Sequence, residues 1–255
     1  MKNKRFLSLA AALMLMGTAW AQHEGPVLTD YFNEVAATTV STPDDNGFIR
    51  RWMLLEPVGK PNRSNTPFVD SYLREHLTQE YFKDQFTIMP KAGQKVTATY
   101  NVEEMPANFD YRNPTPPTVK TVKSKLAWHE LESKRQNVKL FRFASGLDKQ
   151  VYGVIFYAVT VIDCEEEMKD VRLAIGSNSG SMWWLNGEEA LILSGDRRMV
   201  QDDCVSKRLT LKKGRNVLRG AIINGPGMSD FCVRFIDEKG NPVKGYIVVS
   251  KSVKK

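Results

Sequence analysis

The pair Trp183-Trp184 is the pattern in this sequence with the clearest chemical use. An indole ring can stack on the apolar face of a sugar, while planar polar side chains hydrogen-bond to the sugar hydroxyls. Loops expected near these tryptophans supply such polar groups. The candidate ligand-binding residues are Trp183, Trp184, Asn178, Arg197, Arg198, Asp202, Asp203 and Asn224.

Each of these residues also has a simpler structural interpretation. For the four tryptophans after the signal peptide (Trp52, Trp128, Trp183 and Trp184), the simpler interpretation is that most of them fill the core. Neighbours on a strand point to opposite faces. One of Trp183 and Trp184 is therefore expected in the core, and the other faces solvent, a second layer or a ligand. Asp202 and Asp203, on a loop close to Arg197-Arg198, are expected to form structural salt bridges or to take part in a calcium or sugar site.

No motif in the sequence predicts a catalytic centre. The segment Gly176–Gly180 comes closest to a G-x-S-x-G nucleophile elbow, but Asn178 stands at its centre and a hairpin is expected to follow it. Metal-spaced histidines, a P-loop and a dinucleotide fingerprint are all missing from the sequence. We expect no cofactor, apart from an optional structural calcium. An esterase or glycosidase using Ser177, Ser179, His129 or the aspartates is the alternative.

The cysteines Cys164, Cys204 and Cys232 allow one disulfide and leave one thiol, with three possible pairings. Cys232 lies in a β-type run, where a buried unpaired thiol is an equally good interpretation. None of the three lies in a nucleophile motif with a histidine. A cysteine-dependent enzyme is therefore not expected.

The first residues resemble a secretory signal peptide. Lys2, Lys4 and Arg5 precede the apolar stretch 6–16, and Ala19-Trp-Ala21 provides a cleavage site before Gln22. The apolar stretch is shorter than the roughly 20 residues that span a bilayer. We expect export by the Sec route to the periplasm, outer surface or extracellular space. No transmembrane segment is expected after cleavage.

Composition narrows the class of protein. The chain has 255 residues, 42% hydrophobic and 25% charged, which excludes intrinsic disorder and a multi-span membrane protein. Its net charge is +7, and removal of residues 1–21, which carry three basic and no acidic side chains, leaves +4. Because basic residues are scattered among acidic ones, nucleic acid is not an expected partner.

Short β-type runs separated by turns dominate the chain, so the predicted fold is all-β, a β-sandwich or jelly roll. One amphipathic helix, residues 71–85, is expected to pack on it, with Asp70 or Ser71 as its N-cap. Asn186-Gly187 predicts a two-residue hairpin turn.

The expected domains are a signal peptide at 1–21, an approach segment at 22–46, a sandwich at 47–250 and a basic tail at 251–255. The expected strands are 48–55, 126–131, 137–143, 152–162, 171–175, 182–185, 205–211, 216–223, 231–236 and 246–250.

Several spaced segments resemble galactose-binding-like β-sandwich modules. They occur in the expected order and cover about residues 150–243: Val171–Asn178, Trp183–Gly187, Leu209–Asn216, Asn224–Gly227 and Phe231–Phe235. The chain is also similar to non-catalytic regions that accompany acetylxylan and feruloyl esterases of Bacteroidetes-type glycan degraders. The resemblance implies carbohydrate binding on a sandwich fold.

We therefore expect an exported, non-catalytic carbohydrate-binding or accessory module that acts in the breakdown of xylan-type plant polysaccharide. Its partners would be a polysaccharide or oligosaccharide and a separately encoded esterase or glycosidase. Two alternatives stay open. One is a carbohydrate-active enzyme, and the other is a cell-envelope module that binds protein.

Overall fold

The computed structural model describes residues 28–36, 39–59, 69–104, 112, 115–178, 180–195, 197–225 and 227–249. The predicted signal peptide at 1–21 and the basic tail at 251–255 lie outside these ranges, so both stay predictions. Over the described ranges, no helix has the length and apolar character needed to cross a membrane.

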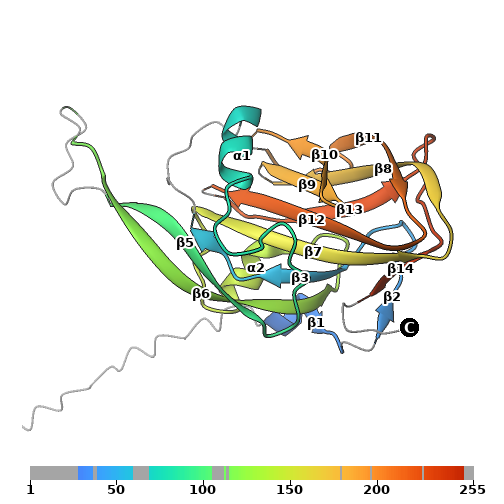
Figure 1. Ribbon diagram of the computed structural model, residues 1–255, viewed down its shortest axis with the longest axis horizontal. Helices are drawn as coiled ribbons and strands as arrows, with labels where there is room; N and C mark the ends of the chain where they lie inside the picture. The colour runs from blue at the N-terminus through green and yellow to red at the C-terminus, as the bar shows by residue number, and fades with distance from the viewer. Residues whose placement is uncertain are drawn as a thin grey trace, which may run out of the picture.

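Strands are the commonest secondary structure of the described chain (Figure 1). The helical elements are η1 (Leu28–Asp30), α1 (Asp70–Leu77) and α2 (Leu140–Ser145). The strands are β1 (Phe32–Glu34), β2 (Val40–Ser41), β3 (Arg51–Leu55), β4 (Val58–Gly59), β5 (Lys95–Glu104), β6 (Thr118–Ser133), β7 (Val154–Cys164), β8 (Met168–Ser177), β9 (Ser181–Leu185), β10 (Glu188–Leu193), β11 (Cys204–Leu211), β12 (Gly214–Asn224), β13 (Phe231–Ile236) and β14 (Tyr246–Val249).

These strands form two antiparallel sheets. The large sheet runs β1-β6-β3-β7-β12-β9-β10, with β4 and β14 paired to β7, β2 to β14 and β5 to β6. The small sheet is β11-β8-β13. Figure 1 shows β5 and β6 leaving the body as a long two-stranded ribbon. The all-β sandwich is confirmed, and β1 and β2 show that parts of the expected approach segment belong to the large sheet.

The large sheet is covered on both faces. Between the two sheets lies the main core, which includes Trp52, Trp183 and Phe231. On the outer face, α1 and the segment that follows it cover a second core with Leu73 and Trp128. Every residue of β7 is accordingly buried, with alternate side chains in the two cores. The outer core matters for function because the candidate site lies at its edge.

Two segments differ from the sequence predictions. The helix predicted for 71–85 ends at Leu77, and its N-cap is Val69 without a side-chain cap bond. Apolar residues continue at helical spacing beyond Leu77, but they pack from an irregular segment in which Asp84 has a φ of 61°. The strand predicted for 137–143 is instead mostly α2, which buries Leu140 and Phe143 one turn apart.

The tryptophan hairpin folds as predicted. Asn186 and Gly187 have φ values of 53° and 89°, the left-handed conformation that a tight hairpin turn requires. Trp183 packs in the main core directly over Gly220, where a Cβ atom would lie 2.4 Å from the ring. Glycine at 220 is therefore needed to seat the indole.

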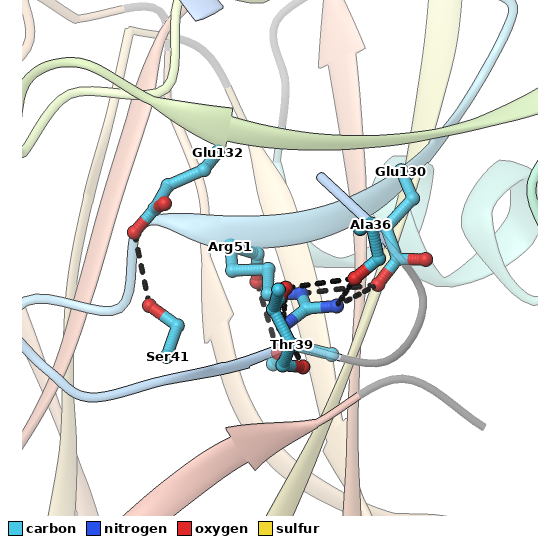
Figure 2. A network of polar contacts seen from close by, with 7 residues as sticks. Ala36, Thr39, Ser41, Arg51, Glu130 and Glu132 are labelled. Carbon is cyan, nitrogen blue, oxygen red and sulfur yellow. Dashed lines mark hydrogen bonds and ion pairs between the residues drawn. The ribbon is translucent and has the colours of Figure 1, made fainter. Parts of the chain in front are cut away.

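A buried ion pair joins β3 to β6, and its arginine also bonds to the segment between β1 and β2 (Figure 2). Arg51 donates from Nε to Glu130 Oε1 at 3.0 Å and from Nη2 to the same oxygen at 2.6 Å. Its Nη1 donates to the Thr39 carbonyl at 2.6 Å, while Ser41 donates to Glu132 at 2.9 Å. The bonds between Arg51 and Glu130 satisfy polar groups that are buried on the outer face, while the Ser41–Glu132 bond is part-buried.

The three cysteines are free, so the described chain contains no disulfide among Cys164, Cys204 and Cys232. Burial raises the pKa of the Cys232 thiol to about 12 and that of Cys164 to about 11. Both behave as small apolar core residues.

Candidate functional site

One row of side chains crosses six strands on the outer face of the large sheet. Strand register places its members opposite one another in the order Glu130, Met53, Val159, Arg219, Trp184 and Glu189. Because paired residues in antiparallel strands project to the same face, Arg219 of β12 and Trp184 of β9 are direct neighbours. These two residues form the centre of the candidate site.

A pocket of about 270 Å³ opens over this pair. Its lining comes from the segment after α1 (Thr78 and Phe86), from the sheet (Trp184 and Arg219) and from the hairpin turn (Gly187). The rings of Phe86 and Trp184 meet edge to face, with centroids 5.6 Å apart. Since Trp184 and Phe86 are only partly buried, the pocket presents two aromatic surfaces at its opening.

Arg219 forms the charged part of the pocket. The residue is only 7% exposed. Among the described residues, its Nη1 has no hydrogen-bond partner, and Nη2 contacts only the weak acceptor Met89 Sδ at 3.7 Å. Burial lowers the pKa of the guanidinium to about 10, so it remains a cation at neutral pH.

The two acidic residues at the ends of the row have their own partners. Glu189 accepts two bonds from Arg74 of α1, one of them at 2.8 Å and the other shorter. Glu130 is held by Arg51. Adjacent strands lie about 4.8 Å apart, so the Glu189 backbone is roughly 10 Å from that of Arg219, with Trp184 between them. Among the side chains that the structure describes, none compensates the charge of Arg219 at the pocket.

The hairpin turn at the rim of the pocket is anchored by two asparagines. Asn186 accepts from the backbone N–H of Val217 at 2.9 Å and donates to Asn216 Oδ1 at 2.9 Å. Fully buried Asn216 also donates to the Lys212 carbonyl at 2.7 Å. Asn216, the last residue of the Leu209–Asn216 segment, thus holds the turn that carries Gly187.

The charged candidates predicted from sequence lie outside the pocket, and three of the four form salt bridges. Arg197 donates to Asp203 at 2.6 Å. Asp202 accepts from Arg234 Nε at 3.0 Å and from its Nη2 at shorter range, and the same arginine bonds to the Asn46 carbonyl. The salt-bridge interpretation of these aspartates therefore describes the structure. Arg198 is exposed in the same loop.

The remaining candidates are also separate from the pocket. Asn178 joins the charged loop, since its carbonyl accepts from the Arg197 N–H at 3.1 Å. Asn224 is fully buried and donates to the carbonyls of Val151 and Gly227. Trp183 has no exposed surface, so a ligand contact through its ring is incompatible with its burial. Of the eight predicted residues, only Trp184 lines the pocket.

Within the described ranges, no three His, Cys, Asp or Glu side chains are grouped to hold a metal ion. The structural calcium therefore stays a prediction without an assigned site. The residues named for the enzymatic alternative are dispersed: Ser177 is buried and shares a hydrogen bond with Ser181, while His129 Nε2 lies 3.3 Å from Glu56. Ser179 is outside the described residues.

Sequence reasoning missed Arg219, Phe86 and Thr78. A signal existed for Arg219, which is the only charged residue in the apolar run 217–223 of an expected strand. A lone charge in a buried run needs a partner. Phe86 and Thr78 gave no comparable signal, because the predicted helix 71–85 included Thr78 and ended directly before Phe86.

Comparison with known proteins finds no matching family model and no matching curated protein. Among solved structures, the chain is similar to the PA14 domain of the MpAFP antifreeze protein, with 8% identity over 87% of this chain and 98% of that one, and a TM-score of 0.39. It is also similar to a PA14 sugar-binding domain from an RTX adhesin, with 9% identity, 78% and 96% coverage and a TM-score of 0.38. At these TM-scores, neither structure says which ligand this chain binds.

Proposed function

We propose that this chain is a non-catalytic carbohydrate-binding module whose site is the pocket formed by Trp184, Phe86, Arg219, Thr78 and Gly187. The observation that carries the proposal is the partly exposed indole of Trp184, which lies against Phe86 and beside the buried Arg219. Aromatic faces with a few fixed polar groups are what a pyranose ring requires.

The size of the pocket agrees with a small ligand or one end of a chain. Ligand pockets commonly measure about 300–1,000 Å³, and this one, at about 270 Å³, falls just below that range. A single sugar unit with its neighbour outside the pocket suits such a volume. The finer form of the proposal names a xylan-type plant polysaccharide, an exported chain and a separately encoded esterase or glycosidase as partner, all of which rest on the sequence.

The test is affinity electrophoresis of the chain from Gln22 onward against xylan, arabinoxylan, mannan, pectin and cellulose. We expect retardation on at least one polysaccharide, lost in Trp184→Ala and kept in Tyr152→Ala. Tyr152 is a matched control because it is an exposed aromatic residue outside the pocket. Thermal unfolding of both variants separates lost binding from lost folding.

Two further measurements on the same sample address the alternatives. Hydrolysis of p-nitrophenyl acetate that survives repurification would support the enzymatic alternative, and loss of retardation with a chelator would support the calcium site. Retardation that Trp184→Ala leaves unchanged would place carbohydrate binding elsewhere. Absence of any retardation would overturn the proposal and favour the protein-binding module.

A further inference from the structure

We infer that the pocket selects a saccharide bearing a carboxylate, a uronic acid unit, and that Arg219 binds this group. The inference rests on the proposed function, since it names the class of sugar that the same site takes. Its basis is the unpaired guanidinium together with the two rings beside it.

A neutral sugar leaves this charge uncompensated. Hydroxyl groups can accept bonds from a guanidinium, but a carboxylate also neutralises it and matches its planar fork with two parallel hydrogen bonds. Arg219 is 7% exposed, so solvent screens an interaction there only weakly. The guanidinium therefore favours an anionic ligand over a neutral one of the same shape.

Within the described ranges, no carboxylate is paired with Arg219. The nearest acidic members of the row, Glu189 and Glu130, are held by Arg74 and Arg51. Burial alone shifts the pKa of Arg219, with no opposing carboxylate among the described residues. The partner of this cation is therefore expected from outside the chain.

The aromatic rings add a requirement of their own. A small inorganic anion could neutralise Arg219, but it would leave the rings of Trp184 and Phe86 uncovered. A uronic acid ring stacks on Trp184 while its carboxylate reaches the neighbouring strand, because Arg219 and Trp184 are directly opposed. A ligand with both an apolar ring face and a carboxylate thus satisfies the whole pocket.

The experiment uses matched pairs that differ only in the carboxylate: polygalacturonate and its methyl ester, glucuronoxylan and its carboxyl-reduced form, and alginate and its carboxyl-reduced form. Binding is measured by affinity electrophoresis at 0.15 M salt. We expect at least tenfold tighter binding to one acidic member than to its neutral counterpart, a common size for a hydrogen bond to a charged group. Arg219→Met should remove this preference.

Two controls separate the pocket from general attraction to polyanions. Arg208→Met removes the same charge from the exposed surface of β11 and should keep the preference. Arg219→Lys keeps the charge but lacks the planar guanidinium, so it should keep only part of the preference for the acidic form.

The outcomes distinguish the two proposals. Equal binding of acidic and neutral forms, with dependence on Trp184, would overturn the uronic acid inference and leave the carbohydrate-binding function standing. A preference that Arg219→Met does not change would overturn the role of Arg219. Absence of binding to every acidic and neutral form would overturn both the inference and the proposed function.

Discussion

Replacing Arg219 with methionine is expected to stabilise the free protein while abolishing its selectivity. Methionine keeps the length of the aliphatic stem and removes a charge that no described residue compensates. Most substitutions of buried residues destabilise a protein. A gain in stability here would therefore be a specific consequence of the unpaired guanidinium.

The structure sets the expected size of this gain. A fall in the pKa of Arg219 from 12.5 to about 10 corresponds to at most roughly 3 kcal/mol of disfavoured charge. A buried donor without a partner costs about 1–3 kcal/mol, and the two costs overlap. We expect the free energy of unfolding of Arg219→Met to rise by about 2 kcal/mol, which raises Tm by about 4–8 °C in a domain of this size.

Urea denaturation at pH 7 measures this difference in the free energy of unfolding, with the same m-value expected for the variant and the parent protein. Arg208→Met is the matched control, and as an exposed residue in a surface ion pair it should change the free energy of unfolding by less than about 1 kcal/mol. If Arg219→Met instead lowered the free energy of unfolding by more than about 1 kcal/mol, the guanidinium would have compensating contacts in the folded chain. The reasoning from an unpaired charge would then be refuted.

Three further predictions concern the fold. Trp183→Ala should cost about 3–5 kcal/mol, because it empties a fully buried indole site over Gly220, and urea denaturation would show it. Glu130→Ala should lower the free energy of unfolding by about 3–5 kcal/mol, because Arg51 stays buried without its carboxylate. The double variant Arg51→Met/Glu130→Met should lower it clearly less, which a double-mutant cycle measures. Burial opposes ionisation of Glu56, but bonds from Ala127, His129 and Lys149 together lower its pKa below 4.5. The ionised Glu56 carboxylate therefore stabilises the folded state fully above pH 4.5, and this contribution is lost as the pH falls through the lowered pKa. When the free energy of unfolding is measured against pH in acid, Glu56→Gln should lack this loss of stability.

The sequence predicted those parts of the fold that follow from local patterns. The strand at Phe231–Ile236 has the predicted bounds, and Asn186-Gly187 forms the predicted turn, because alternation and positive φ are local properties. The strand assignment at 137–143 was wrong because short apolar runs do not distinguish a strand from one turn of helix. Only packing of Leu140 and Phe143 against the main core decides between them.

The candidate site was harder to predict because its residues meet only through tertiary structure. Trp184 was identified as one of two alternatives, and strand alternation could not say which tryptophan faced the core. Phe86 reaches the pocket because the chain leaves the helix at Leu77, eight residues before the predicted end. Arg219 becomes a neighbour of Trp184 only when β12 pairs with β9.

The position of Arg219 within its row connects stability with binding. At the same depth in the outer face, Met53 and Val159 show that apolar side chains fit there, so the sheet itself has no need of a cation. A charge that weakens the free fold becomes favourable once a ligand supplies the missing anion. Affinity for an acidic sugar should therefore rise from methionine through lysine to arginine at position 219. The free energy of unfolding of the unliganded protein should be highest for methionine, so that the substitution that stabilises the fold most binds the acidic sugar least.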